Sequence, residues 1–373
     1  MTITGNASVV HGSRQQRKAD QRLGITTHKR DFIILSKKEQ NILHDKLLAK
    51  CHSSARLQAQ GYRLTVSPPE KKPRKEKTPK EMSPEDKAPA KSSSGKKARQ
   101  EKSPEAGSDQ NNSSGKTASK ELSKFSKVNF RETILFTHTP RPFPGQSYET
   151  RKAIALDCEM VAVTGGQDEL AFLSAVDFFT GEVLIHSYVQ PTKRVIQWRS
   201  SVSGISPTAM AAAIAAGQTL RGWRSAQQAL WKYADADTVL IGHCLQYDLN
   251  VLRIIHPKVV DSAIVSGEAV FNKGPDAPLK RVWALKTVAK EFLNRDIQTG
   301  GRRGHDSLED TYATRDVVIW CLRNPDQLAA WGENARAEHE LKMEQLRKAY
   351  EAREQERRRK RSRRKSRWRT NGG

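Results

Sequence analysis

Hydrophobic residues gather in the middle of this chain, where their spacing first follows the two-residue repeat of strands. Branched and aromatic residues dominate three runs bounded by polar residues, which predicts three strands. The strands lie at about 153–159, 170–178 and 182–190. Gly181 supplies the turn between the last two strands, so we expect a β-meander.

After the meander, the pattern alternates between helical and strand-like stretches. The predicted helices lie at about 206–217, 219–234, 279–294 and 306–323, and a further one carries Leu249, Leu252 and Ile255. The predicted strands lie at 239–244 and 259–265. Three strands followed by alternating helices and strands predict an α/β fold, a mixed β-sheet flanked by helices, in place of an all-parallel sheet. We place this domain at 143–332.

The N-terminal part contains one isolated helical pattern. Ser36 and Glu39 have the spacing of a capping box, and leucines and an isoleucine follow at helical spacing to about Ala55. This predicts a short amphipathic helix in an N-terminal arm, residues 1–66, that docks on a protein partner through 36–55 or on the body of the chain. Residues 67–142 are rich in Lys, Ser and Pro, which predicts a disordered linker.

Charge separates the middle of the chain from its flanks. The formal net charge is +24, yet residues 151–332 contain 20 Lys and Arg and 19 Asp and Glu. The excess therefore lies in the arms, as in proteins that bind polyanions such as nucleic acid. From residue 333 to 373 we expect a charged helix and a basic tail, in which ten of the 13 residues from 357 to 369 are basic. This block favours a nuclear or nucleolar address and an RNA-binding arm over a merely solvated charge run.

Some classes of protein are disfavoured by what the sequence lacks. The four cysteines have neither C-x-x-C spacing nor histidines at zinc-site spacing, so a structural zinc site is not expected. No apolar run reaches 18 residues, so we expect no membrane span. The cysteines are Cys51, Cys158, Cys244 and Cys321, and we expect Cys158 and Cys244 in buried strands.

Two acids interrupt the first strand of the meander, in the stretch A-L-D-C-E-M. Asp157 and Glu159 are two residues apart and therefore share one face, whereas the apolar residues between and around them take the other. Two buried like charges need a counter-charge, and no Lys or Arg is near in the sequence. A divalent cation that takes oxygen ligands would meet this need. The alternative is that both acids lie at an exposed strand end and are solvated.

Three further residues change the balance between these readings. Asp248 lies in the first turn of a helix that leaves a short apolar strand, where a side chain is delivered to the edge of a sheet. Asp310 lies on the inward face of a predicted helix, and His305 comes five residues before it on a glycine-rich loop. A plainer reading exists for this helix start, because Asp306 and Glu309 have capping-box spacing.

The order of these motifs resembles that of a known family. D-C-E-M, G-H-C-x-x-x-D-L and H-x-x-x-x-D are similar to the three exonuclease motifs of the DEDDh family of 3′→5′ exonucleases, which adopt the RNase H-like fold. The wording D-C-E-M-V, the V-S-G-I at 202–205 and the basic flanks resemble the eukaryotic RNA exonucleases linked to ribosomal RNA processing. The resemblance covers about residues 150–325.

The resemblance implies a role for each acid and for the histidine. Asp157, Glu159, Asp248 and Asp310 would bind two Mg²⁺ or Mn²⁺ ions about 3.5–4 Å apart. Asp157 would bridge both ions, and Asp248 would act through water. His305, with an ordinary pKa of about 6.5, would take the proton from the attacking water. The product would be a nucleoside 5′-monophosphate released from a 3′ end.

The substrate contacts are less specific. Met160 would touch the terminal nucleoside, and Arg302 and Arg303 would touch phosphates; core packing and a solvated loop are equal readings. Thr311 stands where alanine is usual, and the connections 268–280 and 297–304 are long, which leaves the choice of substrate open.

We therefore expect a metal-dependent 3′→5′ exoribonuclease that acts on single-stranded 3′ ends of ribosomal or other RNA precursors in the nucleus or nucleolus. Two alternatives remain at this stage. The same site would serve a DNA exonuclease, since contacts to the 2′-hydroxyl decide the preference. A non-catalytic RNA-binding assembly factor would keep the fold, although the presence of every acid and the histidine argues against it.

Overall fold

The central feature of the structure is a mixed sheet whose first three strands form the expected meander. The computed structural model describes residues 32–66, 136–142, 149–271, 274 and 277–370. The meander strands are β2 (Ala153–Val163), β3 (Gln167–Asp177) and β4 (Val183–Gln190), which pair antiparallel. Gly181 has φ +72° in the turn before β4, a conformation that suits glycine.

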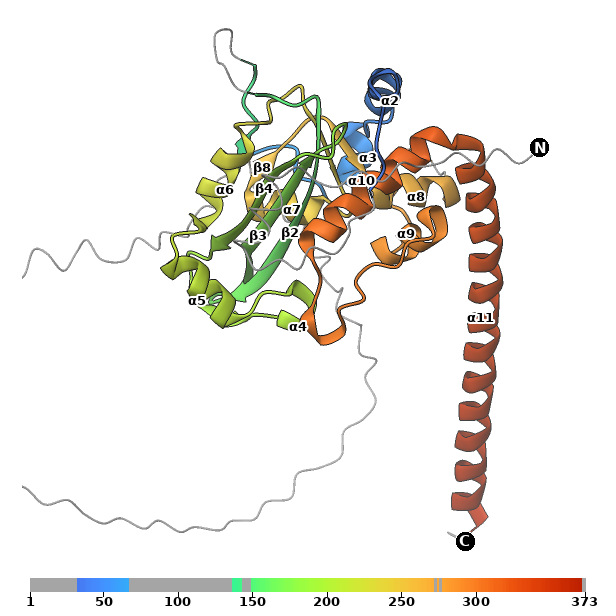
Figure 1. Cartoon of the computed structure of the whole chain (residues 1–373). Coiled ribbons are helices and arrows are strands. Elements are labelled where there is room, and N and C mark those ends of the chain that lie inside the picture. The colour runs from blue at the N-terminus through green and yellow to red at the C-terminus, as the bar shows by residue number, and fades with distance from the viewer. Residues whose placement is uncertain (1–31, 67–135, 143–148, 272–273, 275–276, 371–373) are drawn as a thin grey trace, which may run out of the picture. The chain divides into compact units, whose positions relative to one another are not determined.

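Parallel strands extend the sheet on both sides of the meander (Figure 1). On one side β7 (Val239–Gly242) pairs parallel with β2, and β9 (Val259–Asp261) pairs parallel with β7. On the other side β6 (Thr219–Arg221) pairs parallel with β4. In addition, β5 (Val195–Gln197) pairs antiparallel with the end of β2, on the edge opposite β3. The spatial order β6-β4-β3-β2-β7-β9 is that of a mixed sheet, so the predicted α/β fold with a mixed β-sheet is confirmed.

Helices cover both faces of the sheet, as Figure 1 shows. On one face, α10 (Ser307–Arg323) packs on β2, β3 and β7, and α9 (Leu285–Leu293) packs on α10; Ala153, Ala155 and Ile241 belong to the core on this face. On the other face, α7 (Gln246–Leu252) packs on β2 and β3, and α6 (Gly222–Leu230) packs on β3 and β4; Ile154 and Leu156 belong to the core on this face. Odd-numbered β2 residues therefore face α10 and even-numbered ones face α7. Shorter helices are α4 (Ser200–Ser203), α5 (Pro207–Ala215), α8 (Ser262–Val270) and the 3-10 turn η2 (Gly301–Arg303).

Several predicted element bounds are wrong for local reasons. The predicted strand 259–265 stops at Asp261, because the Asp261 side chain accepts the N–H of Ala263 and starts α8. The predicted helix 219–234 begins as strand β6 and becomes helical only at Gly222, where φ is +70°. The predicted helix 279–294 is shorter and spans α9 alone. Cys244 lies in the turn after β7 rather than in a strand.

The N-terminal helical pattern forms α2 (Lys37–Ala49), with the capping box of Ser36 and Glu39 present as expected. A second helix, α3 (Ser54–Ala59), follows it. The buried Leu43 and Leu47 join the core cluster of α10. In addition, the Arg315 guanidinium donates to the carbonyl of Ile33 over 2.8 Å. The helix therefore docks on the body of the chain.

The N-terminal segment 32–66 and residues from 136 onward belong to one compact unit, which is distinct from residues 67–134. Within this unit β1 (Thr137–His138) pairs parallel with β8 (Ile254–Ile255). Residues 1–31 of the predicted arm and 67–135 of the predicted linker lie outside the described residues. The domain boundaries drawn from the sequence stay predictions.

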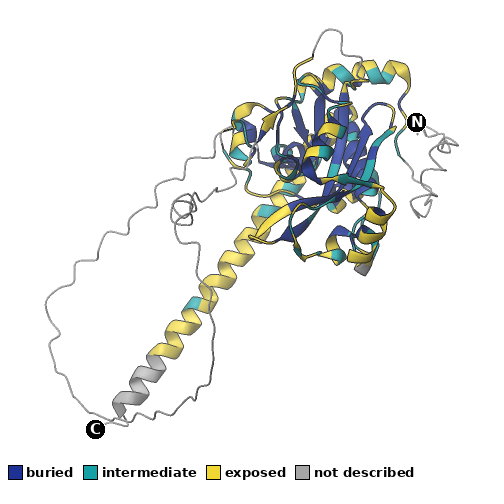
Figure 2. Ribbon diagram, turned by 90° about the vertical axis from the view of Figure 1, so that its left-hand side faces the viewer, coloured by how far each residue is buried: buried dark blue, intermediate teal, exposed yellow. Residues whose placement is uncertain are grey.

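Among the described residues, the C-terminal helix α11 (Pro325–Thr370) packs on the domain through its first part, for example through Leu328, Arg336 and His339. A Cβ at Gly332 would collide with the carbonyl oxygen of Ala269, so the glycine lets α11 lie close to α8. Beyond this contact, side chains up to residue 361 are mostly exposed (Figure 2). Ion pairs one turn apart, such as Lys360 with Glu356 at 2.6 Å, line the helix. Among the described helices, none combines the length and apolarity that crossing a bilayer requires.

Candidate active site

The β2 acids lie on the strand face that α10 covers. Asp157 is half-buried and Glu159 is 8% exposed. The pairing of β2 with β3 shifts register between Glu159 and Met160, which marks a bulge directly after the second acid. The hydroxyl of Ser307 donates to the carbonyl of Asp157 over 3.2 Å, so the start of α10 is fixed against this part of β2.

Asp310 reaches the same place from the first turns of α10. The Asp306 side chain caps the helix by accepting the N–H groups of Leu308 and Glu309. The reciprocal capping box expected here is absent, because the Glu309 carboxylate accepts the N–H of Gln298 instead, at 2.8 Å. Asp310 is 4% exposed and faces inward. An acid at this position faces the β2 acids across the gap between helix and sheet.

His305 lies on the loop before α10, and the V-S-G-I segment fixes this loop. The His305 N–H donates to the carbonyl of Val202 over 2.8 Å. Gly204 has φ +68° and lies so close that a Cβ there would be 2.5 Å from the carbonyl oxygen of His305. Similarly, a Cβ at Gly304 would collide with the backbone nitrogen of Gly204. Two glycines thus allow the backbones of α4 and of the histidine loop to come into contact. This contact fixes the position of the His305 backbone.

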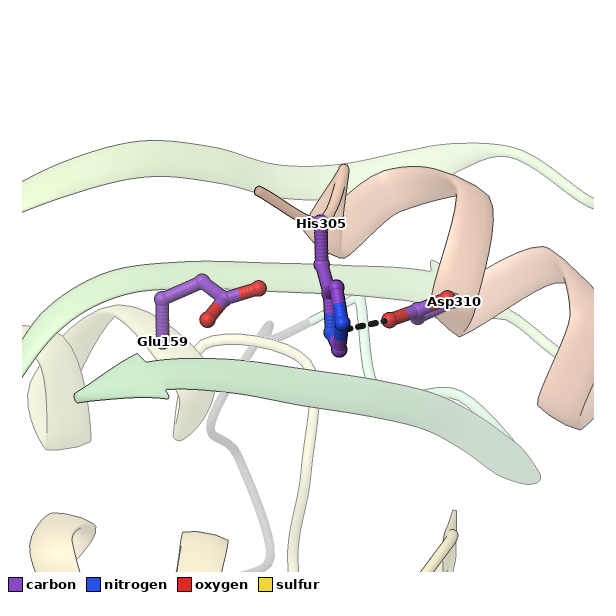
Figure 3. Close-up of side chains that lie close together, drawn as sticks. All are labelled: Glu159, His305 and Asp310. Carbon is purple, nitrogen blue, oxygen red and sulfur yellow. Dashed lines mark ion pairs between the residues drawn. The ribbon is translucent and has the colours of Figure 1, made fainter. Parts of the chain in front are cut away.

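Three side chains from these elements converge, as Figure 3 shows. One ligand atom each from Glu159, His305 and Asp310 lies within 4.8 Å of the others. The Nδ1 atom of His305 is 3.5 Å from the Asp310 carboxylate. Asp157 and Asp248 lie outside this trio. Asp248 is 5% exposed, and its Oδ1 accepts the N–H of Cys158 over 2.8 Å, so it approaches β2 between the two acids.

Gln298 is a site residue that the sequence reasoning missed. Its side-chain amide donates to Asp310 Oδ2 over 3.0 Å, and its backbone has φ +58°, which is uncommon for a residue other than glycine. Strained backbone of this kind often gathers at functional sites. The Oδ1 atom of the same carboxylate is buried and has no hydrogen-bond partner in the part of the chain that the structure describes.

Burial and mutual repulsion raise the pKa of every acid in the group. Burial raises the pKa of Asp157 to about 6, although a hydrogen bond from Ser307 opposes the rise. Burial and then the charge of Asp157 raise the pKa of Asp310 to about 8 and that of Glu159 to about 10. The same two causes raise the pKa of Asp248 well above its usual value. The ionised group is therefore unfavourable without added positive charge.

The histidine experiences the opposite shift. Burial lowers the pKa of His305, and the positive charge of Lys286 on α9 lowers it further. A lowered pKa leaves the imidazole neutral at neutral pH, which a proton acceptor requires. Lys286 did not stand out in the sequence, because nothing in the local pattern places it near the histidine.

The four carboxylates fit a divalent cation in their chemistry as well as in their placement. They supply oxygen atoms, the ligand type that Mg²⁺ and Mn²⁺ prefer. Among the described residues, no Lys or Arg forms an ion pair with any of the four. The unpartnered Asp310 Oδ1 is a buried acceptor that a cation would satisfy.

The expected substrate contacts lie around this centre with different surroundings. Met160 is half-buried and packs against the apolar cluster on the α7 side of the sheet. Arg303 is exposed in η2, whereas the side chain of Arg302 lies outside the described residues. His243 makes a hydrogen bond of 2.8 Å to the hydroxyl of Ser262, which is a structural role.

Comparison with known proteins finds relatives that are named RNA exonucleases. No family model matches it. It is 36% identical over 214 residues to the putative RNA exonuclease pqe-1 of Caenorhabditis elegans, covering 55% of this chain but only 12% of the worm protein. Of solved structures, the Pan2 catalytic unit of Neurospora crassa matches with a TM-score of 0.40 and 22% identity, over 52% of this chain and 31% of that one.

One relative is matched over most of its length. RNA exonuclease 4 of Candida glabrata is 36% identical over 196 residues, which are 50% of this chain and 68% of the relative. This relative is named an exonuclease, which agrees with the resemblance of the motifs around Asp157, Asp248 and Asp310 to exonuclease motifs. The chain belongs to the family of RNA exonucleases, which are of the DEDD type and have the RNase H-like fold.

Proposed function

We propose that this protein is a metal-dependent 3′→5′ exoribonuclease that releases nucleoside 5′-monophosphates. One observation carries the proposal: Glu159, His305 and Asp310 converge within 4.8 Å, and Asp310 keeps a buried oxygen without a partner among the described residues. Such a group has no use in a core that only needs to be stable, because uncompensated buried charge destabilises a fold. It suits a centre that binds cations and a phosphodiester.

The residues divide the chemistry between them. Asp157, Glu159, Asp248 and Asp310 would hold Mg²⁺ or Mn²⁺, which supplies charge stabilisation for the phosphoryl group and lowers the pKa of water. Because His305 Nδ1 faces Asp310, its Nε2 is the atom that accepts the proton of the attacking water. The Asp310 carboxylate and the close contact with α4 orient the imidazole. Gln298 in turn orients Asp310 through its amide.

RNA is the proposed substrate, in preference to DNA, because the relatives that the chain matches carry the name RNA exonuclease. The basic end of α11 agrees with a polyanion: Arg357, Arg358 and Arg359 are all exposed on one stretch of helix. We extend the proposal to ribosomal RNA precursors and to the nucleus or nucleolus, on the basis of the basic tail. A non-catalytic assembly factor would have no need for a histidine placed beside the acids, as His305 is beside Glu159 and Asp310.

The decisive experiment uses the full chain and short RNA and DNA oligomers with a 5′ label, each with a 3′-hydroxyl or a 3′-phosphate. With Mg²⁺ we expect stepwise shortening of the RNA with a 3′-hydroxyl and release of 5′-monophosphates. EDTA and Glu159→Gln should each stop the reaction. Degradation that persists in EDTA overturns the metal mechanism, and equal rates on DNA overturn the preference for RNA.

The basic tail calls for its own test. Removing residues 353–373 should weaken RNA binding and make it less dependent on salt, since fewer cations displace counterions. Cleavage of oligomers of a few nucleotides should stay within about threefold, because the catalytic centre is untouched. Binding measured at several salt concentrations checks this, and an unchanged slope contradicts the role of the arm.

A further inference from the structure

The N-terminal segment 32–66 contacts Asp261, a buried acid behind the candidate active site, and the side chain of Tyr62 makes one of these contacts. Tyr62 is 7% exposed, and its hydroxyl donates to Oδ2 of Asp261 over 2.5 Å. Asp261 is 1% exposed and ends strand β9. The two residues are 199 positions apart in the chain, so this bond joins the N-terminal segment to the edge of the sheet.

Asp261 organises the turn that follows the neighbouring strand β7. Its Oδ1 accepts the N–H of Cys244 over 2.9 Å, and its Oδ2 accepts the N–H of Leu245 over 3.0 Å. Cys244 has φ +59°, a left-handed conformation that non-glycine residues rarely adopt without support. The carboxylate of Asp261 supplies that support, because it accepts both N–H groups of the turn.

This turn places a candidate metal ligand. Helix α7 begins directly after it, and its N-cap residue Leu245 provides no side-chain cap. The Asp261 carboxylate therefore takes the place of a helix cap in fixing where α7 starts. Asp248 lies in the first turn of α7 and approaches the N–H of Cys158 between the two β2 acids. A shift of the turn would move Asp248 relative to Asp157 and Glu159.

Tyr62 is itself held in a fixed position. Its N–H donates to the carbonyl of Leu57 at the end of α3 over 3.0 Å, and Leu57 is 2% exposed in the core. His52 in the same segment accepts the backbone N–H of Asp261 over 3.0 Å. Within α3, Arg56 pairs with Glu268 of α8 at 2.7 Å. The N-terminal segment thus forms hydrogen bonds with both the backbone and the side chain of Asp261.

We infer that Tyr62 is a positioning residue for the metal site: its hydroxyl fixes Asp261, Asp261 fixes the β7–α7 turn, and the turn fixes Asp248. This inference rests on the proposed metal-dependent function. It gives the N-terminal segment a part in the reaction although none of its residues touches the reacting atoms. Groups that orient metal ligands from behind typically change metal affinity or activity by about 10–100-fold when they are lost.

The test compares two substitutions of the same kind in the full chain. Tyr62→Phe removes the hydroxyl bonded to Asp261, and Tyr312→Phe removes a buried hydroxyl that donates to the carbonyl of Gly181 over 2.8 Å. Mn²⁺ binding, measured by calorimetry without RNA, gives the first readout. The Mg²⁺ concentration for half-maximal cleavage of a short RNA gives the second. Thermal unfolding in EDTA reports stability alone.

We expect Tyr62→Phe to weaken Mn²⁺ binding and raise the Mg²⁺ midpoint by about tenfold. Saturating Mg²⁺ should restore much of its rate, and Tyr312→Phe should leave both metal readouts unchanged. Equal metal affinity in wild type and Tyr62→Phe, or equal weakening in both variants, overturns the inference. Wild-type protein that binds Mn²⁺ but cleaves no RNA overturns the proposed function while leaving the inference standing.

Discussion

Helix α10 contains two buried aspartates six residues apart, and their surroundings differ completely. Asp316 is fully buried, and its carboxylate pairs with Arg315 at 2.7 Å and with Arg295 at 2.9 Å. It also accepts the N–H of Ile33 over 3.1 Å. Asp310 receives one hydrogen bond from Gln298, and its other oxygen has no partner in the described part of the chain.

The difference separates a structural acid from a functional one. At Asp316 the chain supplies the positive charge itself, and the hydrogen bonds of Asp316 and Arg315 with the backbone of Ile33 fasten the N-terminal segment to α10. At Asp310 no Lys or Arg of the described residues forms an ion pair, and burial with the neighbouring acids raises the pKa of its carboxyl to about 8. A buried charge that is left uncompensated reduces stability, so it persists where a function requires it. The comparison can be tested by changing each side in turn.

The largest effect is expected at the uncompensated acid. Asp310→Asn should reduce the rate of 3′-end cleavage by about 10³-fold or more, because metal binding accounts for several kcal/mol of transition-state stabilisation. Single-turnover kinetics on a short RNA measure this. In EDTA the variant should unfold at the same temperature as wild type or higher, since a buried repulsion has been removed. A variant that is less stable in EDTA would contradict the comparison.

The compensated acid should respond in the opposite way. Asp316→Asn leaves Arg315 buried without its counter-charge, which typically costs about 3–5 kcal/mol of unfolding free energy. Urea unfolding measures the loss. Asp326→Asn, at an exposed position in α11, is the control and should change stability little. A loss as small as that of the control would mean that the ion pairs at Asp316 are not structural.

The position of the histidine can be changed while the acids stay in place. Gly204→Ala would put a Cβ 2.5 Å from the carbonyl oxygen of His305 and should shift the loop. A misplacement of about 1 Å can cost about 10²-fold in rate. Mn²⁺ binding should change little because the acids do not move. Gly217→Ala is a matched control: φ is +67° against +68°, but a Cβ there meets nothing within 4 Å. Equal losses in both variants would reduce the effect to backbone strain.

The smallest effect concerns pH. The carboxyl groups of Asp157 and Asp310 start from an ordinary aspartate pKa of 3.8, which folding raises to about 6 and about 8. Each therefore binds its proton more tightly in the folded chain, so its contribution to stability is full below about pH 4 and is lost as pH rises through about 6 to 8. Without divalent ions, wild type should melt at a higher temperature at about pH 5.5 than at about pH 8. Asp310→Asn should reduce that difference, and an unchanged difference would contradict the assigned environment.

Local patterns in the sequence were sufficient for the strands of the meander and for the shared face of Asp157 and Glu159. Alternation along a strand is a property of adjacent residues, and the structure places Leu156 and Cys158 in the core on the opposite face, as expected. The fold class followed from the order of these elements. The interrupted strand at Asp261 was missed because a helix start can look like the end of an apolar run.

What distinguishes Asp310 from Asp316 was not readable from the sequence. Arg315 is adjacent to Asp316, but Arg295 is 21 residues away and Ile33 is 283 residues away. Gln298 likewise reaches Asp310 from a loop with no marked local pattern. Whether a buried acid has a partner depends on contacts between distant segments, and only the folded chain brings them together.

The N-terminal segment and the domain form one compact unit, although residues 67–134 separate them in the sequence. Residues 67–134 fall outside the compact unit, whereas residues on both sides of them belong to it. A protease that cuts only within 67–134 would therefore divide the chain without dividing the enzyme. The two pieces would remain associated through Leu43 and Leu47, through Arg315 with Ile33, and through Tyr62 with Asp261. Expressed separately, they would form a split exonuclease, in which adding the smaller piece should tighten the binding of metal by restoring the bond from Tyr62 to Asp261.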